Sequence, residues 1–198
     1  MRPFLALTAL ILLPIALALT TGCGEPKITR TPENEVIDLS GNWNATDSRL
    51  LADTLIAQAL QNPWADDFKK TNNRTPVVKI GRIKSLTDGD VINTNIFVED
   101  LVRALNNSGK VRSVASTSEA DQAREERKEQ DVHASEATRK PGFQETGADY
   151  LIIGTIEVQN DQAGGKRQKF YSANVKLTDI KTQEQVPFNG KISKLVER

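Results

Sequence analysis

The chain is poor in the residues that most often carry chemistry. Its 198 residues include one cysteine, Cys23, and one histidine, His133, and its 26 basic residues are balanced by 26 acidic ones. A single cysteine has no partner for a disulfide within the chain. A metal site or a histidine-dependent triad would have to be built on His133, which lies in a polar, charged stretch. Without a basic excess, nothing indicates a nucleic-acid partner. We therefore expect no metal, no cofactor and no catalytic constellation.

Long apolar runs are also scarce, and the one that occurs lies at the N-terminus. Arg2 precedes an apolar stretch over residues 4–19, and small residues then lead to Gly22 and Cys23. A charged, an apolar and a small-residue region in this order are typical of a signal peptide. With the cysteine in place, the segment resembles a bacterial lipoprotein signal, although Thr20 stands where leucine is usual. The alternatives are an ordinary secretory signal with a stray cysteine and an uncleaved anchor helix.

The lipoprotein interpretation predicts how the mature protein begins. Residues 1–22 would be removed, and Cys23 would become the N-terminus and carry acyl chains such as palmitate. Each buried CH₂ group contributes about 0.8 kcal/mol, so two or three chains anchor a protein stably. Gly24 follows the cysteine, whereas aspartate there tends to retain a lipoprotein in the inner membrane. We therefore expect a lipid anchor in the outer membrane, with the protein on its periplasmic side.

The remainder divides into a tether and one folded domain. Residues 23–40 contain Pro26, Pro32 and several charges but little that could pack, which predicts a lipidated N-terminus and a short tether. The 17 residues of 24–40 reach at most about 60 Å when extended, and about 25 Å as a flexible coil. Residues 41–198 are expected to form one globular domain of common size.

Hydrophobic periodicity predicts an α+β domain. Helical spacing indicates one helix from Thr46 or Asp47, either of which could cap it, to about residue 60, and another from a Thr94 cap to Gly109. Residues 118–130 are polar all round and predict a solvated helix held by charge pairs.

Strands are predicted where β-branched or alternating residues occur, at 76–83, 111–114, 150–158, 170–177 and 186–196. Gly164 and Gly165 predict a hairpin turn between two of them, and Pro187 marks the last as weakened or at an edge. The order of elements favours a central mixed or mainly antiparallel sheet with helices packed against it.

Five short segments together resemble the LpoB family. They are 38–49 (DLSGNWNATDSR), 72–75 (NNRT), 92–94 (INT), 104–111 (ALNNSGKV) and 147–151 (GADYL). The resemblance covers nearly all of the expected domain and implies a fold similar to the N-terminal domain of TolB, an αβ sandwich. It also implies a non-enzymatic regulator of peptidoglycan synthesis. Such a lipoprotein binds a bifunctional penicillin-binding protein anchored in the inner membrane and activates it.

Two other functions remain open. Family members that cross the whole periplasm carry a long proline-rich linker, and the short tether here leaves the partner in question. A structural or secretion role is the first alternative, since curli-type secretion lipoproteins share a related core. The insertions here are polar and short, unlike the alternating strands of about 10 residues that a pore requires. A hydrolytic envelope enzyme is the second alternative, and only carboxylate chemistry would serve it.

Four residues are candidates for contact with a partner: Trp43, Asn73, Arg74 and Thr75. An exposed Trp43 would be a good interface anchor, but packing onto the first helix is favoured because large aromatic side chains are mostly buried. Asn73, Arg74 and Thr75 precede a predicted strand and are typical of a turn. Their alternative role is a polar rim that contacts the partner, because loops often carry binding residues.

Overall fold

The structure is a computed structural model that describes residues 27–32, 34–87, 89–133 and 145–197. Contacts divide the chain into two units, Met1–Glu35 and Val36–Arg198. All helices and strands named below belong to the second unit. The predicted signal peptide and Cys23 lie outside the described residues.

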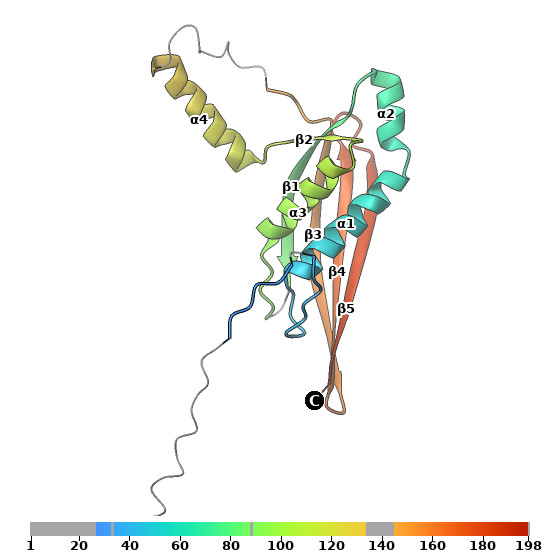
Figure 1. Cartoon of the computed structure of the whole chain (residues 1–198). Helices are drawn as coiled ribbons and strands as arrows, with labels where there is room; N and C mark the ends of the chain where they lie inside the picture. The colour runs from blue at the N-terminus through green and yellow to red at the C-terminus, as the bar shows by residue number, and fades with distance from the viewer. Residues whose placement is uncertain (1–26, 33, 88, 134–144, 198) are drawn as a thin grey trace, which may run out of the picture. The chain divides into compact units, whose positions relative to one another are not determined.

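Within these described residues, helices and strands follow one another in the order ααβαβαβββ (Figure 1). The helices are α1 (Ala45–Gln61), α2 (Trp64–Asn72), α3 (Thr94–Asn107) and α4 (Thr117–His133). The strands are β1 (Val77–Leu86), β2 (Arg112–Val114), β3 (Tyr150–Ala163), β4 (Lys166–Asp179) and β5 (Gln185–Glu197). In the part of the chain that is described, no helix combines the length and the apolar character needed to cross a membrane.

The strands form one mixed sheet in the order β2-β1-β3-β4-β5. β1 is parallel to both of its neighbours, whereas β3, β4 and β5 are antiparallel. Gly164 and Gly165 join β3 to β4 with φ of 55° and 79°, a left-handed conformation that glycine adopts without steric cost. Pro187 lies in β5 at the edge of the sheet, where a missing N–H is tolerated. The predicted α+β class, mixed sheet, hairpin and edge strand are confirmed.

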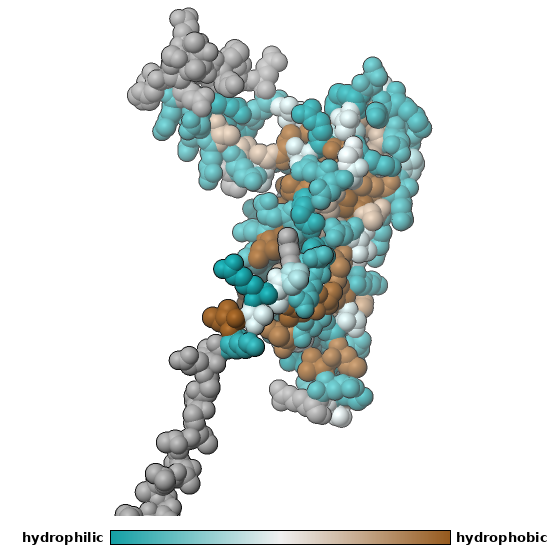
Figure 2. All heavy atoms as spheres, in the orientation of Figure 1, coloured by the Kyte–Doolittle hydropathy of each residue, from teal (hydrophilic) through white to brown (hydrophobic). Residues whose placement is uncertain are grey.

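Two helices cover one face of this sheet (Figure 1). α1 packs over β5 and β4, α3 packs over β1 and β2, and the two helices contact each other. Strand residues on this face are buried at alternate positions, as in β4 at Tyr171, Ala173, Val175 and Leu177. Figure 2 shows the same side of the molecule, with hydrophilic side chains over most of the surface, α4 included, and hydrophobic ones in patches between them. The core therefore lies between the α1–α3 layer and the sheet.

The caps of two helices differ from the prediction. Asn44, not Thr46 or Asp47, caps α1: its side chain accepts a hydrogen bond from the Asp47 backbone N–H at 3.1 Å. The Asp47 carboxylate in turn accepts from the Asn44 N–H at 2.9 Å, which completes a capping box. Asn93, not Thr94, caps α3 by accepting from the Asn95 N–H. In both cases the short amide side chain reaches orphan N–H groups of the first turn.

Helix α2 is absent from the sequence prediction, which left residues 61–75 without an element. The helix is only nine residues long, and its sequence carries a narrow apolar face. That face holds Trp64 and Phe68, whose rings pack edge-on against Tyr150 with centroid distances of 4.8 Å and 5.7 Å. Acidic residues in the first turn and lysines in the last complement the helix dipole. Tertiary packing on Tyr150 thus stabilises a helix too short to persist alone.

Candidate partner-binding surface

The predicted turn at Asn73, Arg74 and Thr75 links α2 to β1. Asn73 ends α2 in the left-handed conformation with φ of 50°, which asparagine tolerates better than most residues. The Arg74 guanidinium pairs with both carboxylate oxygens of Asp149, at 2.7 Å and 2.6 Å, and its carbon lies 4.8 Å from the centre of the Phe68 ring. The arginine therefore ties the end of α2 to the start of β3.

Asp149 is the centre of this junction. Its carboxylate also accepts a hydrogen bond from the Val77 N–H at 2.8 Å. The hydrogen bond from Arg74 outweighs partial burial and holds the pKa of Asp149 below its usual value. The Arg74 side chain is still 52% exposed, so its outer edge is open to a second acidic group. Contact of the turn with a partner stays a prediction, since the arginine has a structural role as well.

Trp43 lies among aromatic residues of the core. Its ring meets Phe97 of α3 and Tyr171 of β4 edge-on, at centroid distances of 6.0 Å and 5.5 Å. The side chain is partly buried and packs against the main hydrophobic cluster. The sequence left two roles open for Trp43, an interface anchor and a part of the core, and this position favours the core role.

Beside Trp43 lies a polar group that we call the Lys169 cluster: the buried side chains of Lys169, Asp90 and Tyr171, with Asn42 at its exposed edge. The Lys169 ammonium, on a residue 2% exposed, donates to the Asp90 carboxylate at 2.6 Å and to the Asn42 side-chain oxygen at 2.5 Å. The Tyr171 hydroxyl donates to the other Asp90 oxygen at 2.5 Å. Burial alone would raise the pKa of Asp90, but the hydrogen bonds from Lys169 and Tyr171 outweigh it and lower that pKa.

A second group, the Lys194 cluster, contains the buried Lys194 and Asp47 and the exposed Asp38. The Lys194 ammonium pairs with both carboxylates at 2.6 Å and donates to the Asn42 carbonyl at 3.0 Å. Burial would lower the pKa of Lys194, but the hydrogen bonds to Asp38 and Asp47 outweigh it and raise that pKa. The two clusters fasten residues 38–44, where the chain enters the domain, to β4 and β5.

Sequence analysis missed these lysines, although one signal for them existed. Lys169 continues the alternate positions of Tyr171, Ala173 and Val175, so the period of the strand places it on the buried face. The partners could not be inferred, because Asp90 and Asn42 are far from it in the chain. Among the described residues, no group of three or more His, Cys, Asp or Glu side chains is arranged to hold a metal ion.

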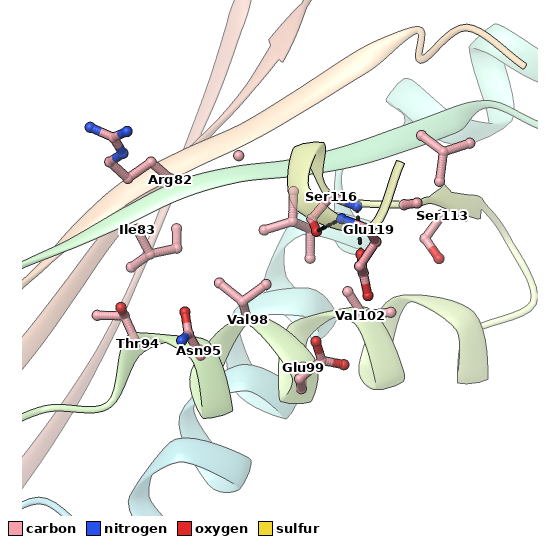
Figure 3. A pocket seen from close by; sticks show the side chains of 14 residues that line it. Arg82, Ile83, Thr94, Asn95, Val98, Glu99, Val102, Ser113, Ser116 and Glu119 are labelled. Carbon is pink, nitrogen blue, oxygen red and sulfur yellow. Dashed lines mark hydrogen bonds between the residues drawn. The ribbon is translucent and has the colours of Figure 1, made fainter. Parts of the chain in front are cut away.

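A groove runs between α3 and the outer edge of β1 (Figure 3). Its volume is about 610 Å³, and apolar side chains of both elements line it, Ile80 and Ile83 from β1 and Val98 and Val102 from α3. Polar side chains at its rim come from α3 and from the start of α4, among them Asn95, Glu99 and Glu119. Ser116 caps α4 in this wall: its hydroxyl oxygen accepts from the Glu119 N–H at 3.5 Å, and its own N–H donates to the Glu119 carboxylate at 2.7 Å.

Comparison with known families assigns the domain. A sequence model of the family described as peptidoglycan-synthase activator LpoB matches residues 47–191, from the first turn of α1 into β5. This chain belongs to the LpoB family. The family assignment confirms the resemblance seen in the sequence, whereas the likeness to TolB stays a prediction. No curated protein sequence matches the chain.

Solved structures similar to this chain include two LpoB proteins. The LpoB C-terminal domain from Salmonella enterica is 18% identical, with a TM-score of 0.41, over 77% of this chain and 99% of that one. The solution structure of Escherichia coli LpoB is 16% identical, with a TM-score of 0.42, over 91% of this chain and 86% of that one. A lipoprotein from Neisseria meningitidis is 16% identical, with a TM-score of 0.39, over 61% and 83% of the two chains.

Proposed function

We propose that this chain is a non-enzymatic activator of a bifunctional penicillin-binding protein, a peptidoglycan synthase. The observation that carries the proposal is the LpoB family match, which extends over residues 47–191 and so includes both covering helices and most of the sheet. Binding would shift the synthase towards an active state, and the activator would supply binding energy that differs between the two states.

The domain would be held at the outer membrane by lipid on Cys23. In this layout residues 1–22 are the signal peptide, 23–40 the anchor and tether, and 41–198 the LpoB-like domain. A tether of at most about 60 Å limits how far the domain can move from the membrane. The synthase must therefore extend towards the outer membrane, or the periplasm must be narrow where the two proteins meet.

The exposed turn at Asn73 and Arg74 is the proposed contact on the activator. Arg74 is pre-oriented by Asp149 and by the Phe68 ring, so little side-chain entropy would be lost when a partner carboxylate binds its open edge. A basic group on the partner would be repelled at the same place. Contact residues of this kind commonly lie on loops that a rigid scaffold holds in position.

A pull-down from detergent-solubilised envelope tests the proposed partner. Full-length chain serves as bait, and captured proteins are identified by mass spectrometry. Recovery of a bifunctional penicillin-binding protein, reproduced when the two purified proteins are mixed, supports the proposal. Recovery of outer-membrane secretion components in place of a synthase would contradict it and favour the secretion alternative.

A further inference from the structure

Strand β1 has an open edge over more than half of its length. It extends over Val77–Leu86, but β2 pairs only with Val77, Val78 and Lys79. The remaining residues of β1 pair with β3 on one side of the strand. On the other side, within the described ranges, no strand follows β2 in the sheet. Such an edge presents N–H and C=O groups ready to pair with another chain.

The hydrogen-bonding pattern shows which residues of β1 direct their backbone N–H and C=O groups to the open side of the strand. The Arg112 N–H of β2 donates to the Pro76 carbonyl at 3.0 Å. Backbone groups alternate in direction along a strand, so those of every second residue from Pro76 onward point towards β2, and those of Ile80 point to the open side. The register then shifts between Ile80 and Ile83. Beyond the shift, Gly154 of β3 lies opposite Ile83. The backbone N–H and C=O groups of Ile83 and Ser85 therefore point to the open side, whereas those of Lys84 pair with β3.

The groove between α3 and β1 lies along this edge. Figure 3 shows Val98 and Val102 of α3 pointing up towards β1, and Ile83 pointing down towards α3. These side chains make an apolar floor within the cavity of about 610 Å³, which has room for a side chain of an added strand. Glu99 and Glu119 are the charged groups on the α3 and α4 side of the groove, and both are acidic.

We propose that an extended segment of the synthase adds to the sheet as a strand beside Ile83 and Ser85 of β1. This inference rests on the proposed function and names a second contact with the partner, in addition to the turn at Asn73 and Arg74. Main-chain hydrogen bonds to the open edge would supply affinity, and an aliphatic side chain in the groove would supply specificity. A lysine or arginine on the segment would complement Glu99.

Charge on the edge argues against a second copy of this chain as the occupant. Arg82 and Lys84 are both exposed on this stretch of β1. Pairing of two identical edges would bring these like charges together, and charged residues on an edge strand discourage self-association. A different protein, with its own pattern of charge, carries no such penalty.

Amide hydrogen exchange on the full-length chain tests the proposal directly. The chain is compared free and in complex with the purified bifunctional penicillin-binding protein. The N–H groups of Ile83 and Ser85 should exchange at least tenfold more slowly in the complex, while that of Lys84 should change little, since it is already bonded to β3. A complex in which Ile83 and Ser85 exchange as in the free chain would overturn the strand addition and leave the proposed function standing. Failure of the two proteins to bind would overturn both.

A matched pair of variants on α3 provides a second measurement. Val98→Arg places a long charged side chain in the groove, whereas Ile96→Arg makes the same change at a residue 46% exposed and outside it. Val98→Arg should raise the Kd for the synthase at least tenfold, with Ile96→Arg close to wild type and both variants folded by circular dichroism. Wild-type affinity of a folded Val98→Arg variant would overturn the proposal. If that variant does not fold, Ser85→Pro, which removes one outward N–H, takes its place with the same expectation.

Discussion

Lys169 and Lys194 lie directly opposite each other on the neighbouring strands β4 and β5, and both are buried beneath the N-terminal end of the domain. Like charges opposite each other in a sheet are destabilising. Here each ammonium has its own acidic partners: Asp90 for Lys169, and Asp38 with Asp47 for Lys194. The repulsion is thereby offset, and the lysine pair fastens residues 38–44 to the sheet.

Loss of one lysine should therefore destabilise the domain strongly. Lys169→Met leaves the Asp90 carboxylate buried without its cation, and removal of one member of a buried pair costs about 3 kcal/mol or more. The control is Lys166→Met in the same strand. The Lys166 side chain is 64% exposed, so its loss should change the free energy of unfolding by less than about 0.5 kcal/mol. Urea unfolding at pH 7 measures both. Equal unfolding free energies for the two variants would show that the buried pair contributes nothing.

Stability should fall at acid pH because of the same cluster. The folded state holds the pKa of Asp90 below its usual value, so the native protein binds fewer protons than the unfolded chain near that pH. The stabilisation is complete above the ordinary aspartate pKa of about 4 and is lost as the pH falls through the lower, folded value. Urea unfolding between pH 7 and pH 3 should give a shallower pH dependence for Asp90→Asn than for wild type. Identical slopes of unfolding free energy against pH for the two proteins would rule out Asp90 as a source of the acid destabilisation.

Gly154 in β3 should not accept a side chain. A Cβ at this position would lie 2.4 Å from the Asn174 carbonyl oxygen of β4, and backbone cannot move aside without breaking the ladder. Gly154→Ala should cost about 2 kcal/mol, in the range of overpacked cores. Gly147→Ala is the control, because nothing lies within 4 Å of its added Cβ. A Gly154→Ala variant that unfolds at the wild-type urea concentration would mean that the two strands separate more easily than this register implies.

Much of this fold could be predicted because its signals are local. Alternation marked β4, paired glycines marked the hairpin, and the apolar spacing of α3 marked a helix. The structure lengthens β3 and β4 beyond their apolar parts, because main-chain pairing continues through residues such as Asn160 and Gln168 that carry no such signal. Helix α2 and the lysine clusters depend on contacts with Tyr150 and Asp90, which lie far away in sequence.

Binding through Arg74 can be separated from its structural role. Arg74→Gln with Asp149→Asn replaces the ion pair by a neutral pair that can still hydrogen-bond across the same junction, whereas Asp149→Asn alone keeps the arginine. If Arg74 binds a carboxylate of the synthase, the double variant should raise the Kd about tenfold, and Asp149→Asn should change it little. Titration of labelled synthase gives both values. Equal Kd values for the two variants would remove Arg74 from the interface.

The proposed lipid anchor would depend on the single thiol of the chain. Cys23→Ser should abolish incorporation of a labelled palmitate analogue and move the protein from the membrane to the periplasmic fraction, because no second cysteine can replace it. Immunoblots of fractionated cells, with labelling in parallel, measure both effects. Full labelling of Cys23→Ser would place the lipid elsewhere, and membrane retention without labelling would favour an uncleaved anchor helix.

Activation of a synthase is the central claim, and the rate of glycan polymerisation tests it most directly. The purified bifunctional penicillin-binding protein is assayed alone and with increasing amounts of full-length chain, in detergent. The account predicts a rate that rises and saturates at the concentrations at which the complex forms. A rate that stays constant while the complex demonstrably forms would contradict it.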